Sequence, residues 1–168
     1  MKNNTSSYNL LLLDDALQSF EIGLMSGVIL WLNEVYGKHI NIHQAKDIRE
    51  ALKVVSNMDK LDVLITDMNL PYHGIPPEKI DKYRSGKLGG IYFIDEILKI
   101  YPLTKIVVVS GWDFDEYKHM LDERVSIALS KPYTLTYLEN ILDTLLQEVT
   151  GIETRTSWEE RNNPSKST

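Results

Sequence analysis

The sequence predicts an α/β protein built on a five-stranded parallel sheet with helices on both faces. Five short and mostly apolar segments alternate along the chain with longer segments whose apolar residues recur at helical spacing. Apolar strands are typical of a sheet buried on both faces, and parallel strands need crossover connections that place helices there. This alternation therefore indicates the α/β class.

The five predicted strands carry different signals. The first and third are apolar runs that stop at aspartates, the second alternates between apolar and polar residues, and the fourth is β-branched. In chain order, the strands are expected at residues 9–13, 40–45, 61–66, 105–109 and 125–130.

The predicted helices are recognised by apolar spacing and by the residues at their ends. Gly37 follows the first helix, Asp47 caps the second, Pro102 stops the third and Gly151 closes the last. In chain order, the helices are expected at about 16–36, 47–55, 90–101, 113–121 and 134–149. Residues 1–150 are therefore expected to form one domain, and the polar residues 151–168 a disordered tail.

Composition excludes several classes of function. The 168 residues suffice for one domain with its own core. A net charge of -6 and a pI near 5.2 argue against a broad nucleic-acid-binding face. The absence of cysteine excludes a disulfide framework and a thiol nucleophile. Without a signal-peptide core or an apolar stretch of ~18 residues, the chain is expected to be cytoplasmic, with no membrane contact.

Polar residues with complementary chemistry follow four of the predicted strands: Asp14 and Asp15, Asp67, Ser110, and Lys131. Ligands of open parallel sheets bind beyond the carboxyl ends of the strands, so these side chains are expected at one edge. Three carboxylates repel one another unless a cation lies among them, and oxygen ligands suit Mg²⁺. Such a carboxylate can attack a phosphoryl group, while a lysine and a serine stabilise the charge that develops.

Four segments, LLLLDD, VLITDMNLP, VVVSG and LSKP, resemble in this order the motifs of receiver domains of two-component response regulators. GIYFIDEIL, from Gly90, resembles the opening of that family's third helix. The resemblance covers about residues 9–149. It implies a flavodoxin-like doubly wound sheet with strand order 2-1-3-4-5.

The resemblance also assigns roles to residues. It implies that Asp67 is the phosphoacceptor and that Ser110 and Lys131 contact the phosphoryl group, with a Lys131–Pro132 bond that is often cis in this family. It implies a Mg²⁺ ion held by Asp14, Asp15, Asp67 and the backbone carbonyl of Asn69.

The same resemblance implies protein partners. The phosphoryl group would come from a histidine kinase or a histidine-phosphotransfer protein, and the chain would catalyse only its own phosphorylation and dephosphorylation. A stand-alone receiver is expected, because no DNA-binding helix-turn-helix follows residue 151. Two alternatives are a receiver-fold module that binds partners independently of phosphorylation and a phosphatase-type hydrolase, although Asn69 stands where haloacid dehalogenase type enzymes have a second aspartate.

Three features depart from the family pattern. Between Asp67 and Gly90 lie 22 residues, whereas such connections usually have about 2–6. Residues 71–89 are expected to form either a lid or specificity element over the phosphorylation site, or a tolerated surface insertion. Ala128 replaces the aromatic residue that receivers commonly place three residues before the lysine, and Trp112 is bulky where the family tunes access of water.

The first helix is expected to carry a docking surface. Successive residues of a helix are rotated by ~100°, so the apolar residues on one side of this helix suffice to cover the sheet. Three further apolar residues lie outside that side: Ile22, Met25 and Ile29. The alternatives for these residues are contact with a partner, a homodimer, or burial against a neighbouring segment.

Overall fold

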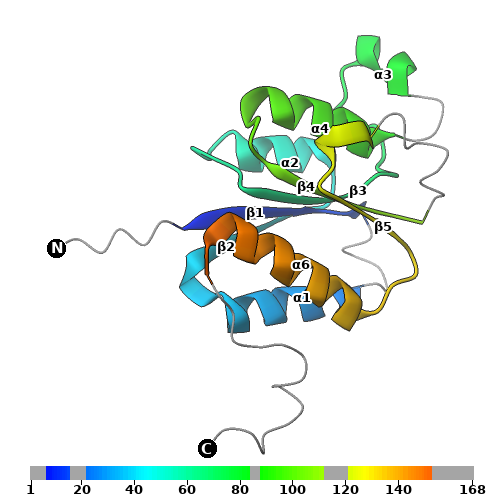
Figure 1. The fold of residues 1–168 in the computed structure, drawn as a ribbon. Helices are drawn as coiled ribbons and strands as arrows, with labels where there is room; N and C mark the ends of the chain where they lie inside the picture. Colours follow the sequence, from blue (N-terminus) through cyan, green and yellow to red (C-terminus); the bar gives the residue numbers. More distant parts are fainter. Residues whose placement is uncertain (1–6, 16–21, 84–87, 112–120, 153–168) are drawn as a thin grey trace, which may run out of the picture. The chain divides into compact units, whose positions relative to one another are not determined.

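The computed structural model describes residues 7–15, 22–83, 88–111 and 121–152 (Figure 1). The chain divides into two compact units, the first ending at Tyr133 and the second beginning at Thr134. The first unit contains every strand of the sheet. In the described part of the chain, no helix has the length and apolar character needed to cross a bilayer.

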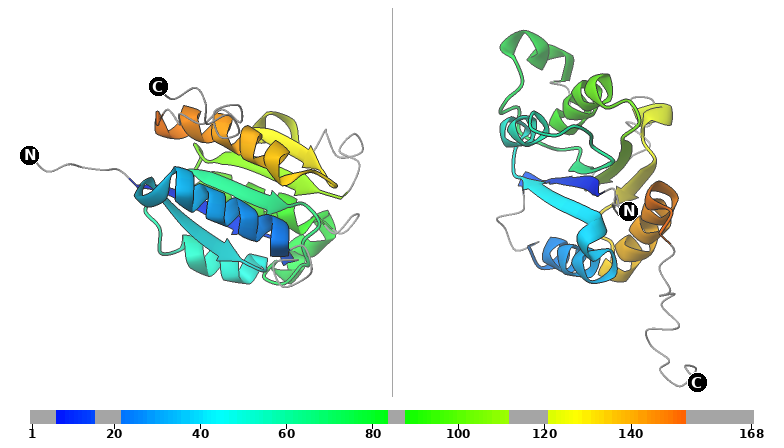
Figure 2. Two further views of the ribbon diagram at one scale, coloured as in Figure 1. Left: turned by 90° about the horizontal axis from the view of Figure 1, so that it is seen from below. Right: turned by 90° about the vertical axis from the view of Figure 1, so that its left-hand side faces the viewer.

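Five parallel strands form one sheet in the order β2-β1-β3-β4-β5, which confirms the predicted order. Figure 2 shows the strands side by side. Their bounds are Tyr8–Leu13 for β1, Ile40–Ala45 for β2, Val63–Asp67 for β3, Lys105–Ser110 for β4 and Ile127–Ser130 for β5. The predicted bounds are confirmed to within two residues at each end.

Alternate residues of the strands point to opposite faces of the sheet. Helices α2 (Ile48–Val55) and α4 (Gly89–Ile100) cover one face, and α1 (Ile22–Val35) lies on the other (Figure 1). The face under α2 and α4 is a buried apolar cluster that includes Leu11, Leu13, Leu64, Ile106 and Val108. The sheet thus has an apolar core on the α2 and α4 side, and its strand ends are left for polar groups.

The capping predictions for Asp47 and Gly151 are confirmed. Asp47 accepts a hydrogen bond from the Glu50 N–H at 2.8 Å and caps α2. In the second unit, Thr134 caps α6 (Leu135–Thr150) through the Tyr137 N–H, and Gly151 ends it with a φ of 65°. The predicted helix at 113–121, residues 16–21 of the first helix and the tail from 153 lie outside the described residues.

The segment between β3 and α4 corrects one prediction, because it contains a helix where only a loop was expected. Helix α3 covers Pro77–Tyr83, with proline at its first position, where a missing N–H costs nothing. Ile75 is buried in the core cluster, and Tyr72 and Ile80 pack against it. Lys79 pairs with Glu96 of α4 at 3.2 Å. Residues 84–87 lie outside the described residues, and the choice between a lid and a surface insertion stays a prediction.

Candidate functional site

Three carboxylates meet at the carboxyl end of the sheet. Asp67 is the last residue of β3, and Asp14 and Asp15 follow β1, which pairs with β3 through Leu13 and Thr66. One carboxylate oxygen from each aspartate lies within 4.8 Å of those of the other two. Asp14 and Asp67 are buried, whereas Asp15 is exposed. The parallel register of two neighbouring strands therefore brings together the acidic residues that the sequence predicted.

Lys131 places an ammonium group beside two of these carboxylates. Its Nζ lies 3.1 Å from Oδ2 of Asp67 and 3.6 Å from Oδ2 of Asp14. Lys131 directly follows β5, and its backbone N–H donates to the Ser110 carbonyl at 2.7 Å. The Lys131–Pro132 peptide bond is cis, as the resemblance implied. The ammonium offsets part of the negative charge of the three aspartates.

The structure shows a backbone donor at the site that the sequence analysis missed. The Asn69 N–H donates to Oδ1 of Asp67 at 2.8 Å, which fixes one oxygen of the carboxylate. An aspartate that accepts a bond from the N–H two residues on forms an Asx turn, so the turn-forming segment after Asp67 was the signal available. The Asn69 side-chain oxygen is buried and has no hydrogen-bond partner among the described residues.

The structure gives the positions of Ser110 and Asn69 but does not test their predicted roles. Ser110 is the last residue of β4 and is fully buried, one position beyond the Val109 that pairs with Asp67. Its backbone is tied to Lys131, and its contact with a phosphoryl group stays a prediction. The metal-binding role of the Asn69 carbonyl also stays a prediction.

Two glycines allow helix α4 to begin directly against the backbone that follows β3. A Cβ atom at Gly90 would lie 2.2 Å from the Asp67 carbonyl oxygen, and one at Gly89 would lie 2.4 Å from that of Leu70. The Gly90 N–H donates to the Met68 carbonyl at 3.1 Å. Despite the insertion, α4 is therefore held against the backbone at the end of β3.

No family model matches the sequence, and no curated protein matches it. Solved structures do resemble it. A two-component transcriptional regulator AraC from Clostridium phytofermentans ISDg is 23% identical, with a TM-score of 0.64 over 86% of this chain and 97% of that one. A response regulator receiver domain protein from Clostridium thermocellum is 24% identical, with a TM-score of 0.57 over 84% and 95%.

A response regulator from Burkholderia pseudomallei, solved with a phosphorylated aspartic acid, calcium ion and citrate, is 18% identical, with a TM-score of 0.54 over 94% of this chain and 82% of that one. Together with the strand order 2-1-3-4-5, these likenesses decide the fold. The chain has the receiver-domain fold. At these identities, the likeness establishes the fold alone.

The acidic cluster of this receiver fold fits a hard divalent cation. It offers three carboxylates, each with one oxygen within 4.8 Å of an oxygen of the other two. The Lys131 ammonium beside Asp67 offsets part of their combined negative charge. Oxygen ligands that leave positions for water are typical of Mg²⁺ sites. The residues that would hold the ion are Asp14, Asp15 and Asp67.

The remaining predictions concern Ala128, Trp112 and the docking surface on α1. Ala128 is exposed on β5, opposite Val108, while Trp112 lies outside the described residues. On α1, Ile29 is partly buried, and the side chains of Ile22 and Met25 are not described. Leu30, which the helical angles did not select, is 70% exposed. The docking surface on α1 stays a prediction.

Proposed function

We propose that this chain is a receiver protein that accepts a phosphoryl group on Asp67 in a Mg²⁺-dependent reaction. The supporting observation is the cluster of Asp14, Asp15 and Asp67 oxygens within 4.8 Å of one another, with the Lys131 ammonium 3.1 Å from Asp67. The presence of a phosphorylated aspartic acid in a fold neighbour supports the same assignment.

In the proposed reaction, a carboxylate oxygen of Asp67 attacks the phosphorus of a phosphohistidine. The new O–P bond forms as the P–N bond breaks, and the imidazole keeps the electron pair and regains a proton. The Asn69 N–H holds one Asp67 oxygen in place, and the Lys131 ammonium is near enough to neutralise charge on the transferred group. Bound Mg²⁺ would supply further charge neutralisation for the phosphoryl oxygens.

The proposed donor is a histidine kinase or a histidine-phosphotransfer protein in the cytoplasm, and the proposed output is contact with a protein target. The chain would act on its own aspartate and on no separate substrate. Because Ala128 replaces an aromatic residue on β5, output through a rotating aromatic side chain is not part of this proposal.

The test is incubation with acetyl phosphate and Mg²⁺ followed by intact mass. The wild-type chain should gain one phosphoryl group in acid-labile form, and Asp67→Asn should gain none. Asp59→Asn is the matched control, because it removes an exposed carboxylate that lines a separate pocket. Uptake by Asp67→Asn at the wild-type rate would show that the site is misassigned.

The same assay separates the two alternative functions. Consumption of acetyl phosphate without a retained group would indicate a hydrolase. No reaction in the presence of a folded protein would indicate a binding module that acts independently of phosphorylation.

A further inference from the structure

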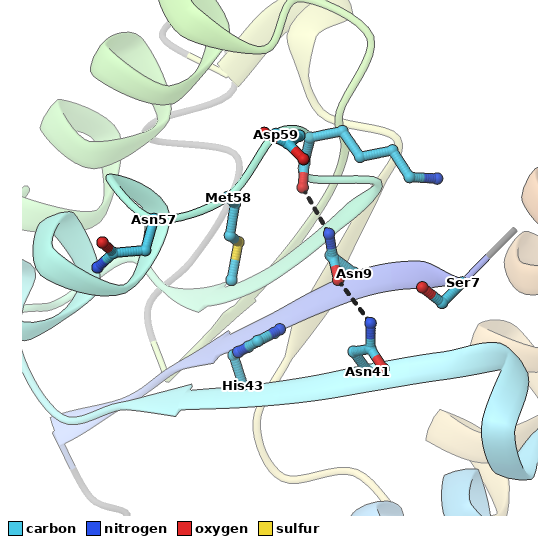
Figure 3. Close-up of a pocket in the computed structure, with 8 residues that line it drawn as sticks. Ser7, Asn9, Asn41, His43, Asn57, Met58 and Asp59 are labelled. Atoms are coloured by element: carbon cyan, nitrogen blue, oxygen red, sulfur yellow. Dashed lines mark hydrogen bonds between the residues drawn. The ribbon is translucent and has the colours of Figure 1, made fainter.

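A pocket lies at the opposite end of the sheet from the three aspartates (Figure 3). Asn9 and Asn41, the second residues of β1 and β2, line it together with the turn at 57–60 that leads toward β3. Its volume is about 340 Å³, within the range of pockets that hold small molecules. It shares no residue with the phosphoacceptor site, so a ligand there would be distinct from the phosphoryl donor.

Three side-chain amides of this pocket donate hydrogen bonds within the protein. The side-chain amide of Asn9 donates to the Lys60 backbone carbonyl at 2.9 Å. The side-chain amide of Asn41 donates to the side-chain oxygen of Asn9 at 3.0 Å. The Asn57 amide donates to the Lys53 carbonyl at 2.8 Å. Figure 3 shows the first two of these bonds along one wall. The side-chain oxygens of Asn41 and Asn57 have no described partner, so the pocket presents acceptors.

The charges of the pocket favour a cation. The Lys60 ammonium pairs with Asp62 at 3.0 Å and lies 4.5 Å from the centre of the Tyr8 ring, so its charge is offset. Asp59 makes no ion pair or hydrogen bond with any other residue that the structure describes. Its exposed carboxylate is therefore the uncompensated charge of the pocket wall.

A buried nitrogen in the wall is a further group in need of a partner. Nε2 of His43 is inaccessible to solvent and has no hydrogen-bond partner within the described ranges. With its proton on Nδ1, the neutral imidazole offers Nε2 as an acceptor. In Figure 3, the flexible side chain of Met58 points toward His43. A ligand that displaces Met58 would give this nitrogen the N–H donor that it lacks.

We propose that this pocket binds a guanidinium group. A guanidinium is planar, carries five N–H donors and can pair with a carboxylate through two hydrogen bonds, which matches the exposed Asp59 carboxylate of this pocket. The same chemistry is found in a free small molecule and in an arginine side chain of a protein.

The test is an NMR titration of the full chain with methylguanidine and, separately, with an acetylated and amidated Gly-Arg-Gly peptide. Saturable chemical-shift changes are expected at the backbone amides of residues 41, 43 and 57–60, and no change is expected at those of Asp14 or Asp67. Methylguanidine binding as tightly as the peptide assigns a small-molecule ligand, and tighter peptide binding assigns a protein arginine. Both outcomes support the guanidinium site.

Matched variants make the titration decisive. Asp59→Asn should weaken binding by about tenfold, because it removes the charge-assisted hydrogen bonds. Glu34→Gln, which removes one exposed charge from α1, should bind like wild type. His43→Phe should also weaken binding while leaving the thermal midpoint unlowered, since the nitrogen it removes has no described partner. The proposal is overturned by absence of saturable shifts, by unchanged affinity in Asp59→Asn, or by equal shifts with sodium acetate.

Discussion

At the residue scale, the position of Lys131 predicts opposite effects on metal binding and phosphorylation. Its ammonium lies beside Asp67 and Asp14, where it repels a divalent cation held by the same carboxylates. Lys131→Met should therefore raise Mg²⁺ affinity by roughly three- to tenfold while slowing phosphorylation by acetyl phosphate. Calorimetric titration and intact mass measure the two effects. Weaker Mg²⁺ binding in Lys131→Met would contradict this electrostatic role.

Gly90 gives a second prediction at this scale, about stability. A Cβ there would lie 2.2 Å from the Asp67 carbonyl oxygen and 2.7 Å from Cα of Met68, and both atoms belong to the backbone. Gly90→Ala should cost about 3 kcal/mol in the free energy of unfolding, because the backbone has to move. Denaturant titration measures the loss. Gly111→Ala is the control, since nothing lies within 4 Å of its new Cβ; equal losses in the two variants would disprove the explanation.

At the scale of elements, α3 is held to α4 by ion pairs around Asp95 and Glu96. Lys79 and Lys99 lie 3.2 Å and 2.6 Å from Glu96, and Lys82 lies 3.5 Å from Asp95. Arg124, in the turn before β5, also pairs with Asp95. These contacts join the insertion, α4 and the turn before β5 through one acidic pair.

The pKa of Glu96 makes part of this linkage dependent on pH. The hydrogen bond from Lys99, assisted by Lys79, lowers the pKa below its usual value of 4.5, while partial burial opposes the shift. A lowered folded pKa adds stability that is fully present above pH 4.5 and is lost as the pH falls through the folded pKa.

Glu96→Gln should therefore lower stability by about 0.5 kcal/mol near neutral pH, because these pairs are partly exposed. The difference from wild type should be constant between about pH 6 and 8 and shrink below pH 4.5, as urea titrations at several pH values would show. A difference that grows as the pH falls would refute the assignment.

At the scale of the whole molecule, ligand binding to the folded chain should raise its thermal midpoint by mass action. Mg²⁺ is expected to raise the midpoint, and Asp15→Ala should abolish most of the rise. Asp15 suits this test because it is exposed, whereas Asp14 is buried. Scanning calorimetry with and without Mg²⁺ measures the shift, with Ca²⁺ as a second ion. The same rise in Asp15→Ala as in wild type would exclude Asp15 as a ligand.

The sheet and the residues at its carboxyl edge could be predicted from the amino-acid sequence alone. Each strand is a short apolar run whose pattern is local, and parallel strands bring the residues after them to one edge wherever the helices begin. We could therefore group four residues from their places at the ends of β1, β3 and β5: Asp14, Asp15, Asp67 and Lys131.

Features that depend on contacts between distant segments could be seen only in the folded chain. Seven residues from Pro77 to Tyr83 are too few to predict a helix among prolines and glycines, and Ile75, Ile80 and Lys79 hold the insertion through partners elsewhere in the chain. The Asn9–Asn41 pair depends on the register of β1 and β2. The apolar pattern of a strand excludes a slip of one residue but does not say which residue of the neighbouring strand lies beside Asn9, because contacts between the two segments set that pairing.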